Sequence, residues 1–312
     1  MFRQAMRRAI PLRVRHEIVA LREVLLDGWR YQRATTPKKR AGSQETSGDQ
    51  HEARLTMDYH RIEKGLALPE PKQPFGATVR ERMVDLLAET PPPNSEGRYV
   101  ELAEQAVSAL DQWNAEGEIE SSVTPLLSDP FAGMSPDVAV RFFGSRHSVR
   151  NYDPSRVPST SELVDGVALA SNTPSVCNRQ AFRVHFYRDR DEIGAILRIQ
   201  NGATAFAQTV PALGVVTARR AMFVGPDERN QRWVDGGLFA MTLVWAFHAL
   251  GLSTCMLNWA LPNVSSNRLR ELAGIPDGED IVVLIAIGHA AEGARVARSE
   301  KRSVDDLGIF HS

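Results

Sequence analysis

The sequence predicts an α+β protein whose second half interleaves helices with strands and whose first half is mostly helical. From Ser135 onward, segments with helical spacing of apolar residues alternate with short β-like segments. The β-like segments are Phe182–Arg188, which alternates, and Ala212–Thr217 and Ile281–Ile287, which are continuously apolar. Between residues 55 and 117 the apolar residues recur at helical spacing. These observations predict helices packed on a sheet, preceded by a helical extension.

The composition is that of a globular chain and excludes several classes of function. The chain has 312 residues and a formal net charge of −1, which argues against nucleic acid as the main partner. Two cysteines, Cys177 and Cys255, provide neither a disulfide framework nor zinc-ligand spacing, and no metal site is predicted. No apolar run approaches the roughly 18–20 residues that span a bilayer. We expect a cytoplasmic protein.

The N-terminal segment is basic and amphipathic. Residues 1–40 carry eleven Arg and Lys against three acidic residues, and seven apolar residues recur every three or four positions: Phe2, Met6, Ile10, Val14, Ile18, Leu21 and Leu25. Pro11 argues against one unbroken helix. Such an arm packs on its own protein, docks on a partner, or makes peripheral contact with an anionic membrane surface through residues 1–30. The polar residues 34–53 are typical of a linker.

Three parts are therefore expected along the chain. Residues 1–54 form a basic arm and linker, residues 55–135 form a helical extension broken at Pro69–Pro74 and Pro91–Pro93, and residues 136–312 form the main domain.

Local signals place the helices of the main domain. Ser135 is a typical N-cap with proline at the first helical position, and it opens a helix to Phe143. Ser159 or Thr160 begins another helix that ends near Ala170, with Glu162 placed for a capping box. Trp233–Leu250 is a long helix with few charges, which indicates burial in a core or at a subunit interface, and Gly251 is its expected C-cap.

Two polar segments carry the candidate chemistry. The sequence RHSVRNY, residues 146–152, brings two guanidiniums and a hydroxyl within five residues, a donor set that suits a phosphate. Taken alone, two arginines in a loop are usually a solvated surface feature. The second segment, residues 171–182, is rich in hydroxyls and amides and lies between a helix and a strand. Ordinary turn chemistry is its simpler interpretation.

Together, in this order, the two segments resemble the motifs of the FMN-dependent nitroreductase superfamily. The first resembles Arg-x-Ser-x-Arg/Lys-x-Phe/Tyr, and PSVCNRQAF, residues 174–182, resembles Pro-Ser-x-x-Asn-x-Gln-Pro-Trp. Later features agree: the stretch 235–252, the strand that ends at Gly288, and a basic cluster before the end of the chain. The resemblance covers residues 136–312 and implies a three-layer fold with a central mixed β-sheet flanked by helices.

The resemblance also implies a cofactor, a partner and a set of binding residues. It implies a homodimer with FMN at the subunit interface and NADH or NADPH as co-substrate. Arg146 and Ser148 are expected to face the FMN phosphate and Arg150 the pyrimidine edge of the ring, with Asn178 contributed by the other subunit. The cofactor-binding candidates are Arg146, His147, Ser148, Arg150, Pro174, Ser175, Asn178, Asn201, Asn258, Lys301 and Arg302. No catalytic side chain is assigned, because the flavin itself carries the chemistry.

The sequence departs from the superfamily pattern at two places. Residues 199–205 lack the usual lysine before the middle strand, and Asn201 is the best substitute. Near flavin N5 the usual Pro-Ile-Glu-Gly is replaced by Met256-Leu257-Asn258-Trp259. Asn258 can still supply a backbone N–H there, whereas Trp259 is expected to narrow the space above the ring. The second change weakens the expectation of broad nitroaromatic reduction.

A fainter resemblance lies in the extension, where YHRIEKGL, residues 59–66, is similar to a motif of extended nitroreductase-like proteins associated with bacterial polysaccharide synthesis. His60 and Glu63, at helical spacing, form either an acid–base pair or, more simply, a structural pair.

Three functions remain open. The first is an FMN-dependent oxidoreductase that transfers hydride from NAD(P)H to a small planar acceptor. The second is a specialised flavin oxidase or dehalogenase-like enzyme. The third is a non-catalytic FMN-binding or scaffold protein of a polysaccharide-assembly system.

Overall fold

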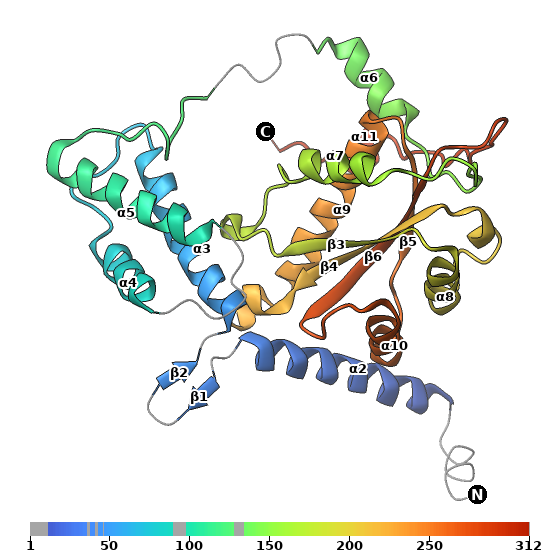
Figure 1. Cartoon of the computed structure of the whole chain (residues 1–312), viewed down its shortest axis with the longest axis horizontal. Coiled ribbons are helices and arrows are strands. Elements are labelled where there is room, and N and C mark those ends of the chain that lie inside the picture. Colours follow the sequence, from blue (N-terminus) through green and yellow to red (C-terminus); the bar gives the residue numbers. More distant parts are fainter. Residues whose placement is uncertain are drawn as a thin grey trace, which may run out of the picture.

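The computed structural model describes residues 12–35, 38–40, 43–45, 47–89, 98–127 and 134–311 (Figure 1). The predicted breaks at Pro11 and Pro91–Pro93 lie outside the described residues, as do parts of the segment expected to be a linker. None of the described helices is long and apolar enough to cross a membrane.

The N-terminal half begins with helix α2 (Leu12–Thr35) and a short hairpin of β1 (Lys38–Arg40) and β2 (Ser43–Glu45). Helix α3 (Gly48–Leu66) then starts within the segment expected to be a linker. Ser47 explains this start, because its hydroxyl accepts the Gln50 N–H while the Gln50 side chain accepts the Ser47 N–H. The expected boundary between residues 54 and 55 therefore falls inside a helix.

Helices α3, α4 (Ala77–Ala88) and α5 (Tyr99–Glu116) enclose an apolar core of their own. Leu55, Ile62 and Leu66 of α3 pack there with Met83 of α4 and Leu110 of α5. This small core is distinct from the cores of the sheet domain, as the separate group of helices in Figure 1 shows.

The second half contains a four-stranded sheet in the order β3–β4–β6–β5. The strands are β3 (Phe182–Tyr187), β4 (Ala212–Arg219), β5 (Ser253–Asn258) and β6 (Glu279–Gly288). Each neighbouring pair is antiparallel, so the expectation of a mixed sheet is corrected. Among the described residues, parallel pairing is confined to an isolated bridge between Ser148 and Thr254.

Helices cover both faces of this sheet, which confirms the α+β class and the three layers. Alternate residues of β6 face opposite layers: Val283 and Ile285 pack with α7 (Thr160–Ala170) and α9 (Gln231–Ala249). Leu284 and Ala286 pack with α8 (Arg190–Gln200) and α10 (Asn263–Ala273). Because side chains alternate along a strand, one continuously apolar strand serves two cores.

The local predictions for helix ends are confirmed. Ser135 caps α6 (Pro136–Ser145), and Ser159 with Glu162 forms a capping box at the start of α7. Gly251 follows α9 with a φ of 78°, a left-handed conformation that glycine adopts without strain. Strand β5 and helices α8 and α10 were not predicted.

Short helices complete the chain. These are η1 (Val176–Asn178), η2 (Ala207–Thr209), η3 (Arg220–Met222), η4 (Pro226–Glu228) and α11 (Val304–Leu307).

Candidate functional site

The arginine-rich segment 146–152 runs beside strand β5, at one edge of the sheet. Arg146 ends helix α6, and the chain then extends so that Ser148 forms its bridge with Thr254 of β5. The Val149 N–H donates to the Thr254 carbonyl at 3.0 Å, and Tyr152 bridges Ala290 beyond β6. Backbone pairing therefore holds this segment in an extended form beside the edge strand.

Three of the predicted cofactor-binding residues, Arg146, Ser148 and Arg150, come close to the buried thiol of Cys255. Burial raises the pKa of Cys255, while the charges of Arg150 and Arg146 and a hydrogen bond with Ser148 act to lower it. Arg146 also lies over the ring of Trp245, 5.7 Å from its centroid. Arg150 is exposed, and Arg146 and Ser148 are half-buried. The segment thus presents two guanidiniums and a hydroxyl on one edge, a donor set that fits a phosphate.

His147 belongs to the same segment but is exposed. The described residues form no cluster of His, Cys, Asp or Glu that could hold a metal ion.

The loop of residues 174–180 has an unusual backbone. Cys177, Asn178 and Gln180 have φ values of 50°, 54° and 47°, which non-glycine residues rarely adopt. The Ser175 hydroxyl accepts the Gln180 N–H at 2.9 Å, and the Gln180 side-chain amide donates to the Asn178 amide oxygen at 3.2 Å. Ser175 and Asn178 are therefore tied together through Gln180, next to exposed Pro174. Left-handed residues in a constrained loop often mark functional sites.

Two buried charged residues, which sequence reasoning missed, hold this loop. The Val176 N–H donates to the Asp235 carboxylate of α9 at 3.2 Å, and burial raises the pKa of Asp235. Arg179 donates to Glu228 at 2.8 Å, and its side chain has no exposed surface. A lone acid within an otherwise apolar helix was the signal that could have identified Asp235.

The helical extension lies against the same region. Arg219, at the end of β4, donates to Glu52 of α3 at 2.8 Å, and its backbone N–H donates to the Ala181 carbonyl at 2.8 Å. Helix α3 also contacts η1, which contains Asn178. The extension is thus joined to the structure that carries the loop.

Asn201 and Asn258 lie near each other at the far end of β5. The Asn258 carbonyl accepts a hydrogen bond of 3.2 Å from the side chain of Gln200, the residue before Asn201. Asn201 ends α8 with a φ of 64°. Asn258 is four positions after Thr254, which in a strand is about 13 Å. An elongated ligand with a phosphate at one end and a ring at the other can span that distance.

The loop candidates Pro174, Ser175 and Asn178 are not brought to this edge. The loop 174–180 precedes β3, and strands β3 and β5 form opposite edges of the sheet. Lys301 and Arg302 are exposed, and Lys301 donates to the carbonyl of Ser299 at 2.6 Å. Within the described part of one chain, no hydrogen bond or ion pair joins these residues to Arg146, Ser148 or Arg150.

Trp259, which directly follows Asn258, has a fixed orientation. Its indole N–H donates to the Ser266 hydroxyl of α10 at 2.9 Å, and the ring packs on the core between the sheet and α8. It also lines a cavity of about 360 Å³ together with Glu23 and Asp27 of α2.

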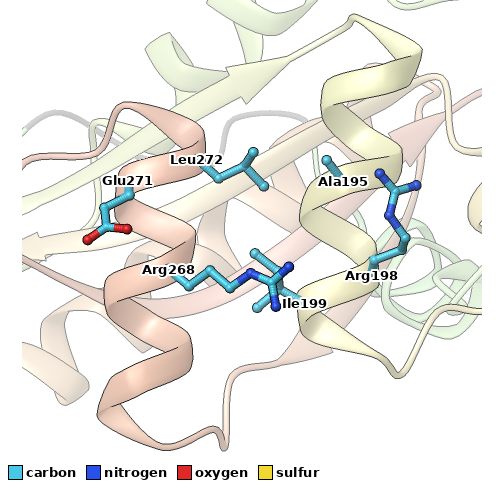
Figure 2. Close-up of a pocket in the computed structure, with 6 residues that line it drawn as sticks. All are labelled: Ala195, Arg198, Ile199, Arg268, Glu271 and Leu272. Carbon is cyan, nitrogen blue, oxygen red and sulfur yellow. The ribbon is translucent and has the colours of Figure 1, made fainter.

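A larger cavity of about 530 Å³ lies elsewhere, between α8 and α10 (Figure 2). Arg198 and Ile199 line it from α8, and Arg268, Glu271 and Leu272 from α10. None of the eleven predicted cofactor-binding residues lines it.

In the extension, His60 Nδ1 lies 2.8 Å from the Glu63 carboxylate on the surface of α3. The neighbouring buried Asp58 is paired with Arg61 and Arg82. Polar pairs within α3 and between α3 and α4 explain this motif structurally.

Comparison with known proteins gives one family. The model of the nitroreductase family matches residues 144–223 and 199–289, which include the arginine-rich segment, the 174–180 loop, Asn201 and Asn258 but neither Lys301 nor Arg302. No functionally curated protein matches the sequence.

Solved structures share the fold at low sequence identity. A candidate nitroreductase of Bacillus subtilis is 16% identical, with a TM-score of 0.51 over 57% of this chain and 100% of that protein. An FMN-dependent nitroreductase of Clostridium difficile is 16% identical, with a TM-score of 0.47 over 55% and 99%. A candidate nitroreductase of Desulfovibrio desulfuricans, solved in complex with FMN, is 18% identical, with a TM-score of 0.49 over 58% and 99%.

Proposed function

Because residues 144–289 of this chain belong to the nitroreductase family, we propose that the protein is an FMN-dependent oxidoreductase with its flavin along strand β5. The observation that carries the proposal is the placement of polar groups at the two ends of that strand. Arg146, Ser148 and Arg150 gather beside Thr254, and Asn258, which is bonded to the neighbour of Asn201, ends the strand four residues further on.

Each group suits a different part of the cofactor. Arg146 and Ser148 offer charge-assisted donors for the phosphate. Arg150, which the resemblance assigns to the pyrimidine edge, lies with Arg146 and Ser148 and adds positive charge at that end of the site. Asn201 and Asn258 provide amide donors and acceptors for the ring oxygens and the region of N5. When bound, FMN supplies the hydride chemistry, which we assign to the transfer of two electrons from NAD(P)H to a small planar acceptor.

The site is proposed to be completed by a second copy of the chain. Pro174, Ser175 and Asn178 lie at the opposite edge of the sheet from Arg146, so one chain does not present both halves to one ligand. The exposed apolar residues Trp233 and Leu238 on α9 suit the interface of such a homodimer. In this arrangement Lys301 and Arg302 add positive charge to the phosphate end of the site. The predicted membrane contact of residues 1–30 is independent of this proposal.

A second candidate is a specialised flavin oxidase or dehalogenase-like enzyme. Trp259, the residue directly after Asn258, favours this candidate. Its ring is held in place by a hydrogen bond to Ser266. Rapid steady-state turnover with quinones and nitroaromatics supports a general reductase, whereas negligible turnover by protein that retains FMN supports the specialist.

The decisive experiment measures flavin binding. Protein purified without added flavin is examined by absorbance and then titrated with FMN, followed by flavin fluorescence. We expect Arg146→Ala to weaken binding by about 1.5–3 kcal/mol, or roughly 10- to 150-fold, because a bond to a charged group is lost. Arg141→Ala, which removes an exposed arginine of α6 five residues away, is the matched control.

Protein that stays colourless when offered FMN refutes the proposed cofactor. Equal affinity of the Arg146→Ala variant and the wild type refutes the assignment of Arg146.

A further inference from the structure

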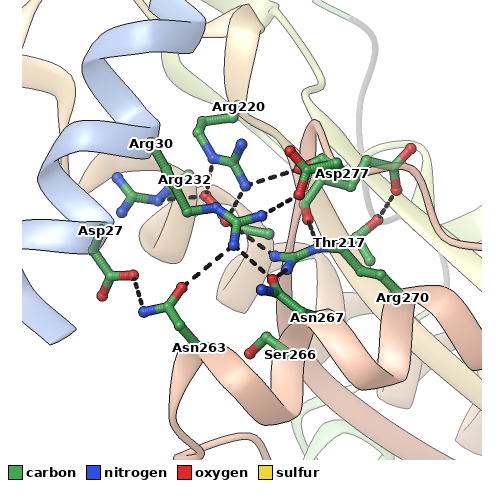
Figure 3. A network of polar contacts seen from close by, with 12 residues as sticks. Asp27, Arg30, Thr217, Arg220, Arg232, Asn263, Ser266, Asn267, Arg270 and Asp277 are labelled. Atoms are coloured by element: carbon green, nitrogen blue, oxygen red, sulfur yellow. Dashed lines mark hydrogen bonds and ion pairs between the residues drawn. The ribbon is translucent and has the colours of Figure 1, made fainter.

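Helix α2 lies along the edge of the molecule and is attached through its polar side (Figures 1 and 3). The Glu23 carboxylate accepts the backbone and side-chain N–H groups of Asn263 at 2.8 and 2.9 Å. Asp27 accepts from the Asn263 side chain at 2.8 Å, and Arg30 donates to Asn267 at 2.7 Å and also pairs with Asp277. The hydrogen bonds from Asn263 lower the pKa of Glu23.

The C-terminal end of α2 is firmly anchored. The Tyr31 hydroxyl donates to the Gly225 carbonyl at 2.7 Å, and burial raises the pKa of Tyr31 to about 12. The Arg232 guanidinium lies 5.0 Å from the centre of its ring. Arg232 in turn joins Arg220 and Arg270 around the Asp280 carboxylate. The orientation of α2 about its axis is therefore set by this network.

The opposite side of α2 is an apolar stripe that faces solvent. Leu21 and Leu25 each lie two residues from Glu23, and Leu25 and Trp29 each lie two residues from Asp27. Two residues are about 200° of helix rotation, so the apolar residues point away from the docked side. Leu21, Leu25 and Trp29 are 60%, 63% and 57% exposed. We define the outer stripe as Val14, Ile18, Leu21, Leu25 and Trp29, all exposed.

This arrangement is the reverse of an ordinary surface helix, which buries its apolar face and exposes its polar face. Here the polar face is used for docking, and five large apolar residues over about four turns are left outward. A contiguous apolar surface of this kind marks an interaction site.

Charge indicates what covers the outer stripe. Arg22 and Arg33 are exposed beside it, and the Arg33 guanidinium lies 5.2 Å from the centre of the Trp29 ring. Of the charged side chains described on α2, Glu23, Asp27 and Arg30 are turned toward the protein, and Glu17 is exposed. Two exposed arginines therefore flank the apolar stripe on its outward side, against one exposed acid besides Asp27. A second copy of the same surface would bring like charges together, whereas anionic lipid headgroups complement them.

We propose that α2 is a docking surface for an anionic membrane, with the outer stripe in the headgroup and acyl boundary and the arginines at the phosphates. An aromatic ring such as Trp29 favours that boundary. The helix lies parallel to the membrane plane, and the sheet domain is held against the membrane through Asn263, Asn267 and Asp277.

The test is co-sedimentation of the full-length protein with two kinds of vesicle, phosphatidylcholine alone and phosphatidylcholine with a quarter phosphatidylglycerol. The wild type is expected to pellet with the anionic vesicles, and high salt is expected to reduce the bound fraction. The Leu21→Asp/Leu25→Asp variant is expected to bind at least about tenfold more weakly, because two inserted side chains become charged.

The matched control is Leu126→Asp/Leu127→Asp, which makes the same change at leucines that are 94% and 93% exposed and lie outside α2. It is expected to bind like the wild type. The Arg22→Gln/Arg33→Gln variant changes only exposed side chains, and it is expected to lose roughly tenfold or more in affinity for anionic vesicles. Circular dichroism and flavin content show that each variant is folded.

Failure of the wild type to pellet with anionic vesicles overturns the proposal, as does equal pelleting of the wild type and the Leu21→Asp/Leu25→Asp variant. A further overturning result combines two measurements. The wild type binds neither kind of vesicle, and analytical ultracentrifugation shows an oligomer of the wild type that the Leu21→Asp/Leu25→Asp variant does not form. That outcome would assign the stripe to a second copy of the chain.

Discussion

The buried carboxylate of Glu279 offers a test of how the centre of the sheet domain is stabilised. It lies at the start of β6 and accepts hydrogen bonds from His185 at 2.7 Å, from Arg183 at 3.0 Å and from the Thr217 hydroxyl. Burial by itself raises the pKa of Glu279, but the hydrogen bonds of His185 and Thr217 and the neighbouring positive charges bring it down from 4.5 to about 2. The perturbation is Glu279→Gln, which keeps the shape and removes the charge.

The size and sign of the effect follow from the shift. A fall from 4.5 to about 2 corresponds to about 3 kcal/mol of stability from the ionised form. Arg183 is half exposed and water screens its share, so about 2 kcal/mol is expected at pH 7. Because the folded pKa lies below the unfolded one, this contribution is complete above about pH 4.5. It is lost as the pH falls toward 2.

The assay is urea unfolding of the wild type and the variant at pH 7, 4 and 3, with Glu271→Gln as a control at an exposed carboxylate. The difference in unfolding free energy between the wild type and Glu279→Gln is expected to shrink toward pH 3. The control is expected to stay within about 0.5 kcal/mol of the wild type at each pH. A difference that is constant from pH 7 to 3, or below about 0.5 kcal/mol at pH 7, refutes the reasoning.

Two further substitutions test the packing of α7 and the support of the 174–180 loop. Gly166→Ala places a methyl group 2.2 Å from the buried Phe247 ring. Overpacking costs about 1–3 kcal/mol, and the higher helix propensity of alanine stabilises by at most about 1 kcal/mol. Urea unfolding is therefore expected to show an unfolding free energy about 1–2 kcal/mol lower than that of the wild type. Asp235→Ala removes the carboxylate that accepts the Val176 N–H. We expect faster amide exchange in the loop and roughly tenfold weaker FMN binding, because one bond to a charged acceptor is lost.

Each of these has a matched control. Gly194→Ala adds a methyl group in α8 whose nearest neighbour is the flexible end of Arg198 at 3.5 Å, so stability is expected to rise by about 0.5–1 kcal/mol. If Gly166→Ala stabilises the protein as much as Gly194→Ala does, the close contact with Phe247 does not destabilise the fold, and the packing argument is refuted. Asp227→Ala removes an exposed acid and is expected to leave FMN binding unchanged. An Asp235→Ala variant with wild-type exchange in the loop would remove the supporting role of Asp235.

The sequence by itself determined the features whose signals span a few residues. Ser135 and Ser159 identified two helix starts because a capping hydroxyl bonds to an N–H only three residues away. Alternation and apolar runs identified β3, β4 and β6. The order of apolar and polar residues within each segment reflects which faces of that strand are buried. The motif order identified the family, with its phosphate-binding candidates at Arg146 and Ser148.

Only the tertiary structure decided what depends on distant segments. The partners Ser148 and Thr254, and likewise Glu23 and Asn263, are more than a hundred residues apart and share no local signal. The amphipathic spacing of α2 therefore predicted that the helix has two faces but not which face is docked. An apolar stripe is ordinarily buried. In α2 the polar side is docked instead, through hydrogen bonds with Asn263 and Asn267. Long-range pairing of this kind is settled by the complete chain, because its free energy comes from groups that meet only after folding.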